Sequence, residues 1–202
     1  MLEETVAERT RQLQRRNNEL ITLNRVSHIA LEATSLADAY QAAAIVISTA
    51  SGFPVVTIER YDNNHEMMVL EAATGMDLST QTAAREIPIS QALSGVAVRT
   101  GKPVVEIKKA ELESGEDENI GTFVSIPLIS GKQVLGALSL FSPEERSVDE
   151  QSLEWFTTLA NQVVAFTGRV RAENDLKEKD ERLHLALEGA EQDIWDLNLQ
   201  TQ

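Results

Sequence analysis

Two pairs of extended segments constrain the fold more than any other feature of this 202-residue sequence. Apolar, largely β-branched residues alternate with polar ones over 55–61 and 67–74, and a second pair of apolar segments covers 122–129 and 134–141. Short turn-forming stretches separate the members of each pair, and connections of that length join antiparallel strands. The sequence therefore predicts two β-hairpins in one antiparallel sheet. The turn-forming stretches are Asp62-Asn63-Asn64-His65 and Ser130-Gly131-Lys132-Gln133.

Helical patterns flank these hairpins. Ser35-Leu36-Ala37-Asp38 matches a capping box and predicts a helix over 36–50 that ends at Gly52. A second box, Ser147-Val148-Asp149-Glu150, precedes an apolar stripe of period 3.6 and predicts a long helix. Between the hairpins we expect a strand over 85–89, a helix over 91–99 and a strand over 103–107. This order predicts an α+β fold in which helices pack on one face of an antiparallel sheet.

The first thirty residues have a different character. They contain neither Gly nor Pro, and Val6, Leu13 and Leu20 recur at intervals of seven, which is typical of a coiled coil. So narrow an apolar stripe has little else in the chain to bury it, which favours a parallel dimer. A solvated amphipathic helix is the alternative.

A second long helix is expected to leave the domain at its carboxyl end. Leu176 and Leu183 continue the apolar spacing through the charged residues 171–190, and Gly189 is the expected end of this connector helix. We therefore expect a homodimer that forms through parallel helices. Its predicted interface residues are Val6, Leu13, Leu20, Leu176 and Leu183.

Composition excludes several classes of function. The chain has 18 basic and 32 acidic residues, a net charge of −14, which argues against a nucleic-acid partner. It has no cysteine, which excludes disulfides, thiolate metal sites and a thioether-linked chromophore. No apolar run approaches the roughly 20 residues that cross a bilayer, and the amino terminus lacks a secretory signal. We therefore expect a cytoplasmic chain with no membrane segment, although a longer parent protein could be membrane-anchored elsewhere.

Several segments together resemble a GAF domain over residues 24–170. The resemblance implies a sensory module with a pocket on the sheet face opposite the long helices, as found in cyclic-nucleotide-regulated enzymes, phytochromes and bacterial sensor kinases. The lack of cysteine argues against the branches of the family that bind a bilin covalently or reduce methionine sulfoxide. The matching segments are Leu36-Ala37-Asp38-Ala39-Tyr40, Ser94-Gly95-Val96-Ala97-Val98-Arg99-Thr100-Gly101-Lys102-Pro103-Val104, Ser125-Ile126-Pro127-Leu128 and Val134-Leu135-Gly136-Ala137-Leu138-Ser139-Leu140.

The flanks resemble signalling segments. Residues 6–13 are similar to the signalling helices that precede such modules, and residues 181–197 resemble the entry of a PAS domain. These resemblances imply a fragment of a bacterial multidomain sensor such as a sensor histidine kinase, with a diguanylate cyclase as another candidate for the output. The expected organisation is a signalling helix over 1–30, a GAF domain over 31–170, a connector over 171–190 and a truncated PAS start over 191–202.

Alternation places a candidate ligand site on the sheet. Because successive strand residues face opposite sides, Thr57 and Tyr61 share a face with Phe123 and Ser125, away from the helices. A few polar groups on an apolar wall are typical of a small-molecule pocket. A filled, ligand-free face is the alternative, and the chain would then be a dimerisation spacer between signalling domains.

Catalytic chemistry finds little support in the sequence. The three histidines have no metal-ligand spacing, and His28 lacks the residues that follow the phospho-acceptor histidine of kinases. The acidic stretch 111–118 has two interpretations, a solvated loop or a cation site. We therefore expect a non-enzymatic module with no metal, whose ligand, where it has one, stays unidentified.

Overall fold

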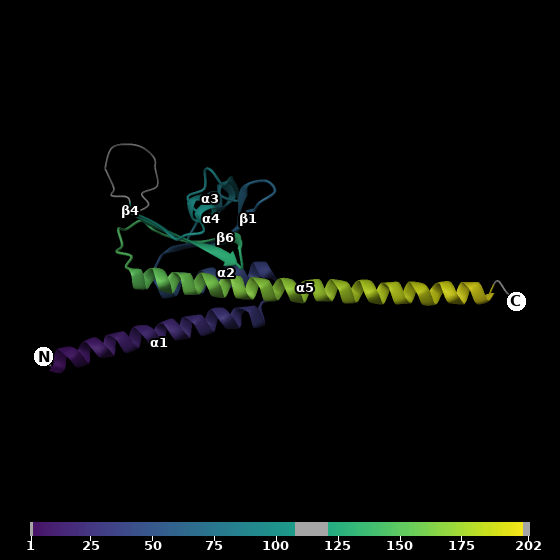
Figure 1. Ribbon diagram of the computed structural model, residues 1–202, viewed down its shortest axis with the longest axis horizontal. Coiled ribbons are helices and arrows are strands. Elements are labelled where there is room, and N and C mark those ends of the chain that lie inside the picture. Colours follow the sequence, from purple (N-terminus) through teal and green to yellow (C-terminus); the bar gives the residue numbers. More distant parts are fainter. Residues whose placement is uncertain (1, 108–120, 200–202) are drawn as a thin grey trace.

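The computed structural model describes residues 2–107 and 121–199. Its strands form one antiparallel sheet that lies on one side of the long carboxyl-terminal helix (Figure 1). The sheet has six strands in the order β3-β2-β1-β6-β5-β4. Both predicted hairpins are confirmed, as β1 with β2 and β5 with β6. The strands are β1 Val55–Asp62, β2 Met67–Thr74, β3 Glu86–Pro88, β4 Val104–Ile107, β5 Thr122–Ser130 and β6 Gln133–Ser142.

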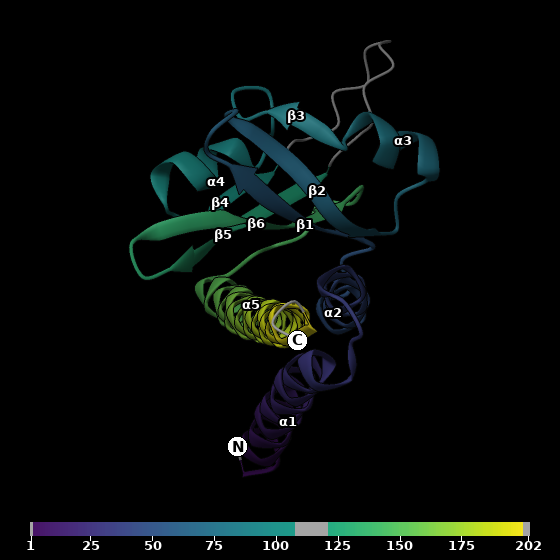
Figure 2. The same cartoon turned by 90° about the vertical axis from the view of Figure 1, so that its right-hand side faces the viewer.

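The helices lie in layers on the two sides of this sheet. Figure 2 shows α2 and α5 side by side against one face, with α1 beyond them and farther from the sheet. The short helices α3 and α4 lie on the other side. The predicted α+β fold is confirmed. In addition, α4 covers part of the sheet face opposite the long helices. The helices are α1 Leu2–Glu32, α2 Leu36–Ser51, α3 Leu78–Ala83, α4 Gly95–Thr100 and α5 Glu150–Leu199.

The main core lies between the sheet and the pair α2 and α5. Ile58 of β1 and Leu138 of β6 are opposite one another in register and fully buried. They belong to one apolar cluster with Ile47 of α2 and Leu159 of α5. Burying side chains of this size contributes about 1.5–3 kcal/mol each, so this side of the sheet supplies most of the hydrophobic stabilisation.

The structure corrects the predicted start of the long helix. Its first residue is Glu150, and the carboxylate of Asp149 accepts a hydrogen bond from the Ser152 backbone N–H at 2.8 Å. Asp149 is therefore the cap in place of Ser147, because an aspartate directly before the first turn reaches the free N–H groups. The first predicted box is confirmed, since Ser35 accepts from the Asp38 N–H at 3.1 Å.

The far end of α5 also differs from the prediction. The helix continues through Gly189 to Leu199, so neither the break at Gly189 nor an extended segment before Leu199 is present. One glycine in a helix interior costs only about 1 kcal/mol, and no proline follows it to stop the helix. The expected start of a PAS domain over 191–202 is thus helical as far as Leu199, and residues 200–202 lie outside the described residues.

The helix α1 has two dissimilar halves. Near its carboxyl end Val26 is fully buried in the main core, and the Ser27 hydroxyl donates to Gln162 of α5 at 3.0 Å. The expectation that the domain cannot bury this helix is therefore wrong for its second half. Toward the amino terminus α1 diverges from α5 (Figure 1), and Leu13 and Leu20 are about two-thirds exposed, at 68% and 65%.

An open groove follows this divergence. It has a volume of about 940 Å³ between α1, α2 and the start of α5, and its lining includes Ile21, Ile45 and Trp155. Leu176 of α5 is exposed as well, whereas the side chains of Val6 and Leu183 lie outside the described residues. Within 2–107 and 121–199, no helix is long and apolar enough to cross a membrane.

Candidate functional site

A row of hydroxyl side chains crosses the sheet on the face away from α2 and α5. Thr57 of β1 is opposite Ser139 of β6, which in turn is opposite Ser125 of β5. All three are buried, and the hydroxyls of Ser125 and Ser139 are 3.1 Å apart in a hydrogen bond. The sequence alternates these residues with Val56, Leu138 and Ile126 of the main core, so the polar row is a consequence of the strand period.

The four predicted site residues share this face. Thr57 and Ser125 belong to the hydroxyl row, and Phe123 of β5 lies 4.9 Å from Phe141 between ring centroids. Tyr61 is partly buried near the far end of β1 and packs against a small apolar cluster around Met68. The structure therefore brings the predicted residues onto one surface, while their binding role stays a prediction.

Among the described residues, three buried side-chain atoms have no hydrogen-bond partner: Thr57 Oγ1, Glu59 Oε2 and Ser94 Oγ. Glu59 follows Thr57 by two residues and so shares its face. Ser94 comes directly before α4, where its hydroxyl would be expected to cap the helix but makes no capping bond. Unpartnered buried polar atoms are rare, and their concentration at one place indicates a site for a partner that the chain does not supply.

Two of these residues were not among the predicted site residues. The strand period puts Glu59 on the same face as Thr57, but nothing in the sequence indicates that a carboxylate is buried in this strand. Ser94 could not be found from the sequence, because its position depends on how α4 folds back over the sheet. The three atoms therefore enlarge the predicted site and shift its centre toward β1 and α4.

The carboxyl group of Glu59 has an unusual environment. The residue as a whole is only partly buried, but its Oε2 is shielded from solvent. Burial raises the pKa of Glu59 above its ordinary value, and the hydroxyls of Ser94 and Ser139 lie close enough to the carboxyl group to oppose this rise in part. Neither Ser94 Oγ nor Glu59 Oε2 nevertheless makes a hydrogen bond of acceptable geometry with a described residue. No basic side chain of residues 2–107 or 121–199 contributes to this balance. Within the part of the chain that the structure describes, this acidic group thus has no cation to pair with.

The short helix α4 covers this site. Val98 of α4 belongs to the same small cluster as Met68 and Ala137. Arg99 donates from Nη1 to the carbonyl oxygen of Ile89 at 2.9 Å, and a Cβ at Gly95 would lie only 2.0 Å from that same oxygen. Glycine at position 95 therefore permits α4 to lie directly on the chain at Ile89.

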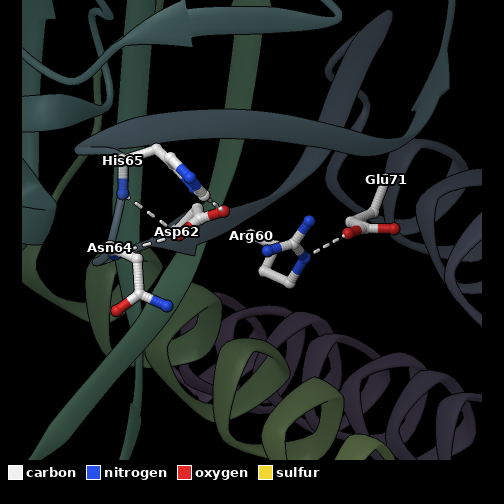
Figure 3. Close-up of polar contacts among 5 residues, drawn as sticks. All are labelled: Arg60, Asp62, Asn64, His65 and Glu71. Carbon is white, nitrogen blue, oxygen red and sulfur yellow. Dashed lines mark hydrogen bonds and ion pairs between the residues drawn. The ribbon is translucent and has the colours of Figure 1, made fainter.

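The opposite face of β1 connects this region to α5. Arg60 donates to Glu71 of β2 at 2.6 Å (Figure 3), and a register shift between Ile58 and Glu59 makes Glu71 an extra residue in β2. Arg60 and Glu71 line a water-sized space of about 10 Å³ together with Arg171 of α5. Glu59 therefore faces the candidate site, while the next residue of β1, Arg60, faces the part of α5 that leaves the domain.

The turn between β1 and β2 has a structural role. Asp62 accepts from the Asn64 backbone N–H at 3.0 Å, and its other carboxylate oxygen lies 3.0 Å from His65 Nδ1 (Figure 3). Hydrogen bonding to His65 lowers the pKa of Asp62, and the same contact raises the pKa of His65. The histidine is exposed and stabilises the turn. Among the described residues no cluster of His, Asp and Glu suits a metal ion, and the acidic stretch 111–118 lies outside them.

The geometry defines an α+β domain with a covered polar site on the free face of its sheet. A sequence model of the GAF domain matches residues 33–166, about two-thirds of the chain, and the chain therefore belongs to the GAF family. GAF domains are sensory and regulatory modules and are typically non-catalytic. None of the curated proteins compared with the chain matches it.

Solved structures show the same fold. The GAF domain of a phosphoenolpyruvate-protein phosphotransferase from Coxiella burnetii is 22% identical with a TM-score of 0.66, covering 78% of this chain and 97% of that one. Free methionine-R-sulfoxide reductase from Neisseria meningitidis, solved with its substrate, is 19% identical with a TM-score of 0.63, covering 75% and 89%. A domain named as part of a two-component sensor histidine kinase protein from Sinorhizobium meliloti is 17% identical with a TM-score of 0.57, covering 72% and 99%.

Proposed function

We propose that this chain is the cytoplasmic sensory module of a two-component signalling protein. A small molecule on the polar face of the sheet changes how the sheet packs against α2 and α5, and α1 and α5 carry the change to neighbouring domains of a homodimer. The observation that supports this proposal is the concentration of three unpartnered buried oxygens on one face, at Thr57, Glu59 and Ser94. Buried polar atoms without a partner are few in folded proteins, and here three of them lie together on the face where the sequence predicts a ligand.

The path from site to helix is short. Glu59 faces the site, while Arg60, the next residue of β1, borders the same small space as Arg171 of α5. Farther along, the hydroxyls of Tyr40 in α2 and Thr167 in α5 are hydrogen-bonded at 3.0 Å. A ligand that moves β1 therefore acts on the section of α5 that leaves the domain. Such coupling requires that the ligand bind the two packing states with different affinity.

The dimer interface is proposed along the free half of α1 and the departing part of α5. Leu13 and Leu20 are exposed leucines on one stripe of α1, and Leu176 is an exposed leucine on α5. Exposed leucines at heptad spacing are best explained by a second copy of the helix, which buries them. Val6 and Leu183 extend the proposed seams in both directions.

Sedimentation velocity at tens of micromolar tests this interface. We expect the wild-type chain to be dimeric and Leu13→Asp or Leu20→Asp to weaken the dimer without unfolding the domain. The matched control is Leu78→Asp, since Leu78 is 82% exposed on α3, on the other side of the sheet. A monomeric wild type would remove the basis of the proposed coupling, and equal dimerisation of all three variants would move the interface elsewhere.

The second candidate is a ligand-free dimerisation spacer, which the burial of Phe123 and Ser125 favours, because both are completely covered in this structure. Thermal-shift screening separates the two functions. A molecule present at 100 times its dissociation constant stabilises the folded state by about 2.7 kcal/mol, whereas a spacer gains nothing from any of them.

A further inference from the structure

The three unpartnered oxygens also constrain what kind of molecule the site takes, an inference that rests on the proposed ligand-binding function. Thr57 and Ser94 are each only 2% exposed, and the Oε2 of Glu59 is shielded from solvent. The hydroxyls of Ser94 and Ser139 both act on the Glu59 carboxyl, and Thr57 is opposite Ser139 in register. The unpartnered atoms therefore gather around one carboxylate.

All three unpartnered atoms can accept a hydrogen bond. An ionised carboxylate only accepts hydrogen bonds, and each hydroxyl oxygen has lone pairs that accept as well. A protonated primary amine carries three N–H donors and no acceptor. We propose that the ligand of this site bears such an ammonium group, which donates to Glu59 Oε2, Thr57 Oγ1 and Ser94 Oγ.

Charge favours the same class of ligand. Among the described residues no basic side chain acts on the Glu59 carboxyl, and the guanidinium of Arg99 donates to the Ile89 carbonyl oxygen. An anion would meet an uncompensated acid in apolar surroundings, and an apolar molecule would leave all three oxygens unpaired. A cation supplies both the missing charge and the missing donors. Hydrogen bonds to charged groups are also the stronger class, so one contact to Glu59 accounts for a large share of the affinity.

The walls around the oxygens limit the rest of the molecule. Met68, Val98 and Ala137 form an apolar cluster on this face, and Phe123 and Phe141 lie against one another beside the hydroxyl row. Because α4 covers the site, a ligand enters when α4 separates from the sheet, and a small substituent is favoured. The inferred class is therefore a small primary amine with a short, largely apolar substituent.

Calorimetric titration tests this inference with methylammonium, propylammonium, ethanolamine and putrescine as probes. Propanol and propionamide serve as neutral probes, and propionate serves as the anionic one. We expect at least one amine to bind the wild type, and Glu59→Gln to weaken that binding tenfold or more. Glu86→Gln removes the same charge from an exposed position of β3 and is expected to leave the affinity unchanged. Burial raises the pKa of Glu59, so the titrations are repeated at several pH values. At any pH where the free protein holds Glu59 protonated, amine binding releases that proton, which two buffers of different ionisation enthalpy detect.

The possible outcomes separate this inference from the function on which it rests. Equal amine affinity in the wild type and E59Q overturns the inference, and so does binding of propionate or propionamide in preference to every amine, while both leave a ligand-binding module standing. If no probe and no member of a broad neutral and acidic library shifts the melting temperature, the result contradicts both the inferred ligand class and the proposed ligand-binding function. Should E59Q fail to fold, Thr57→Val removes one acceptor at nearly constant shape, and an undiminished amine affinity in T57V contradicts the inference.

Discussion

The two faces of the sheet use the same strands for different purposes. On the helix side, Val56, Ile58, Leu138 and Leu140 are fully buried in an apolar cluster. On the other side, their immediate neighbours Thr57, Glu59 and Ser139 form a buried polar region in which hydrogen bonding is incomplete. The helix side therefore stabilises the fold. The other side retains polar atoms without hydrogen bonds, which lower the stability and gain partners only when a ligand binds.

The largest expected effect comes from comparing two consecutive residues of β6, which face opposite sides of the sheet. Leu138→Ala removes a fully buried side chain from the helix side and should lower the free energy of unfolding by about 2–5 kcal/mol. Ser139→Ala on the other face loses one hydroxyl contact and should cost about 1 kcal/mol. Urea unfolding followed by circular dichroism measures both. Equal losses would show that the two faces do not differ in their contribution to stability.

The next effect concerns the cover of the polar face. Gly95→Ala would place a Cβ 2.0 Å from the Ile89 carbonyl oxygen. Helix α4 must then move away from Ile89, which should lower the free energy of unfolding by about 1–3 kcal/mol. Gly168→Ala in α5 is the matched control, since no atom lies within 4 Å of the added carbon and alanine favours a helix by about 1 kcal/mol. Thermal melts should therefore shift in opposite directions. A neutral G95A variant would mean that α4 is not held against Ile89.

Much of the fold was predictable because it depends on local patterns. The alternation in both hairpins, the Ser35 box and the apolar stripe that includes Leu159 and Val163 each specify an element without reference to distant residues. The missed helix α3 had a local signal too, because Asp77 caps it by accepting from the Thr80 N–H at 2.9 Å. Such a six-residue helix has no apolar stripe, and a cap alone is also common in turns.

The site was only partly predictable because it depends on tertiary packing. Period two placed Thr57, Tyr61, Phe123 and Ser125 on one face, and the structure agrees. Whether a strand glutamate is buried depends on what covers the strand, and here the cover is α4. Neither the residue pattern nor the charge of α4 shows from the sequence that it packs over the sheet. The heptad in α1 likewise could not show that Val26 packs into the domain's own core while Leu13 stays exposed.

The third prediction uses the pH dependence of the polar face. The folded-state pKa of Glu59 is raised above its ordinary value of 4.5, so between these two pKa values the folded protein binds a proton that the unfolded chain has lost. The free energy of unfolding therefore falls as pH rises through this window, and the penalty is complete above the folded pKa. Glu59→Gln cannot ionise, so in thermal melts its free energy of unfolding should exceed that of the wild type by about 1 kcal/mol at a pH above the folded pKa, and the two should agree below about pH 4.

A control and a contrary result accompany this experiment. Glu86→Gln removes an exposed carboxylate and should leave in place the fall in stability that Glu59 produces. A wild-type profile that rises between pH 4 and pH 8, together with an E59Q variant that is less stable throughout, would mean that the carboxylate has a partner in the folded chain. The polar face would then be as well satisfied as the helix side.

The smallest expected effect compares two hydroxyls in the same row. Thr57 Oγ1 has no partner, so Thr57→Val removes an unsatisfied buried group at nearly constant shape and should leave the stability unchanged or raise it by up to about 1 kcal/mol. Ser125→Ala breaks the bond to Ser139 and should lower it by about 1 kcal/mol. Paired urea titrations resolve a difference of this size. If T57V is the more damaging of the two, then Thr57 contributes to the fold, and the distinction between a stabilising face and a binding face fails at its central residue.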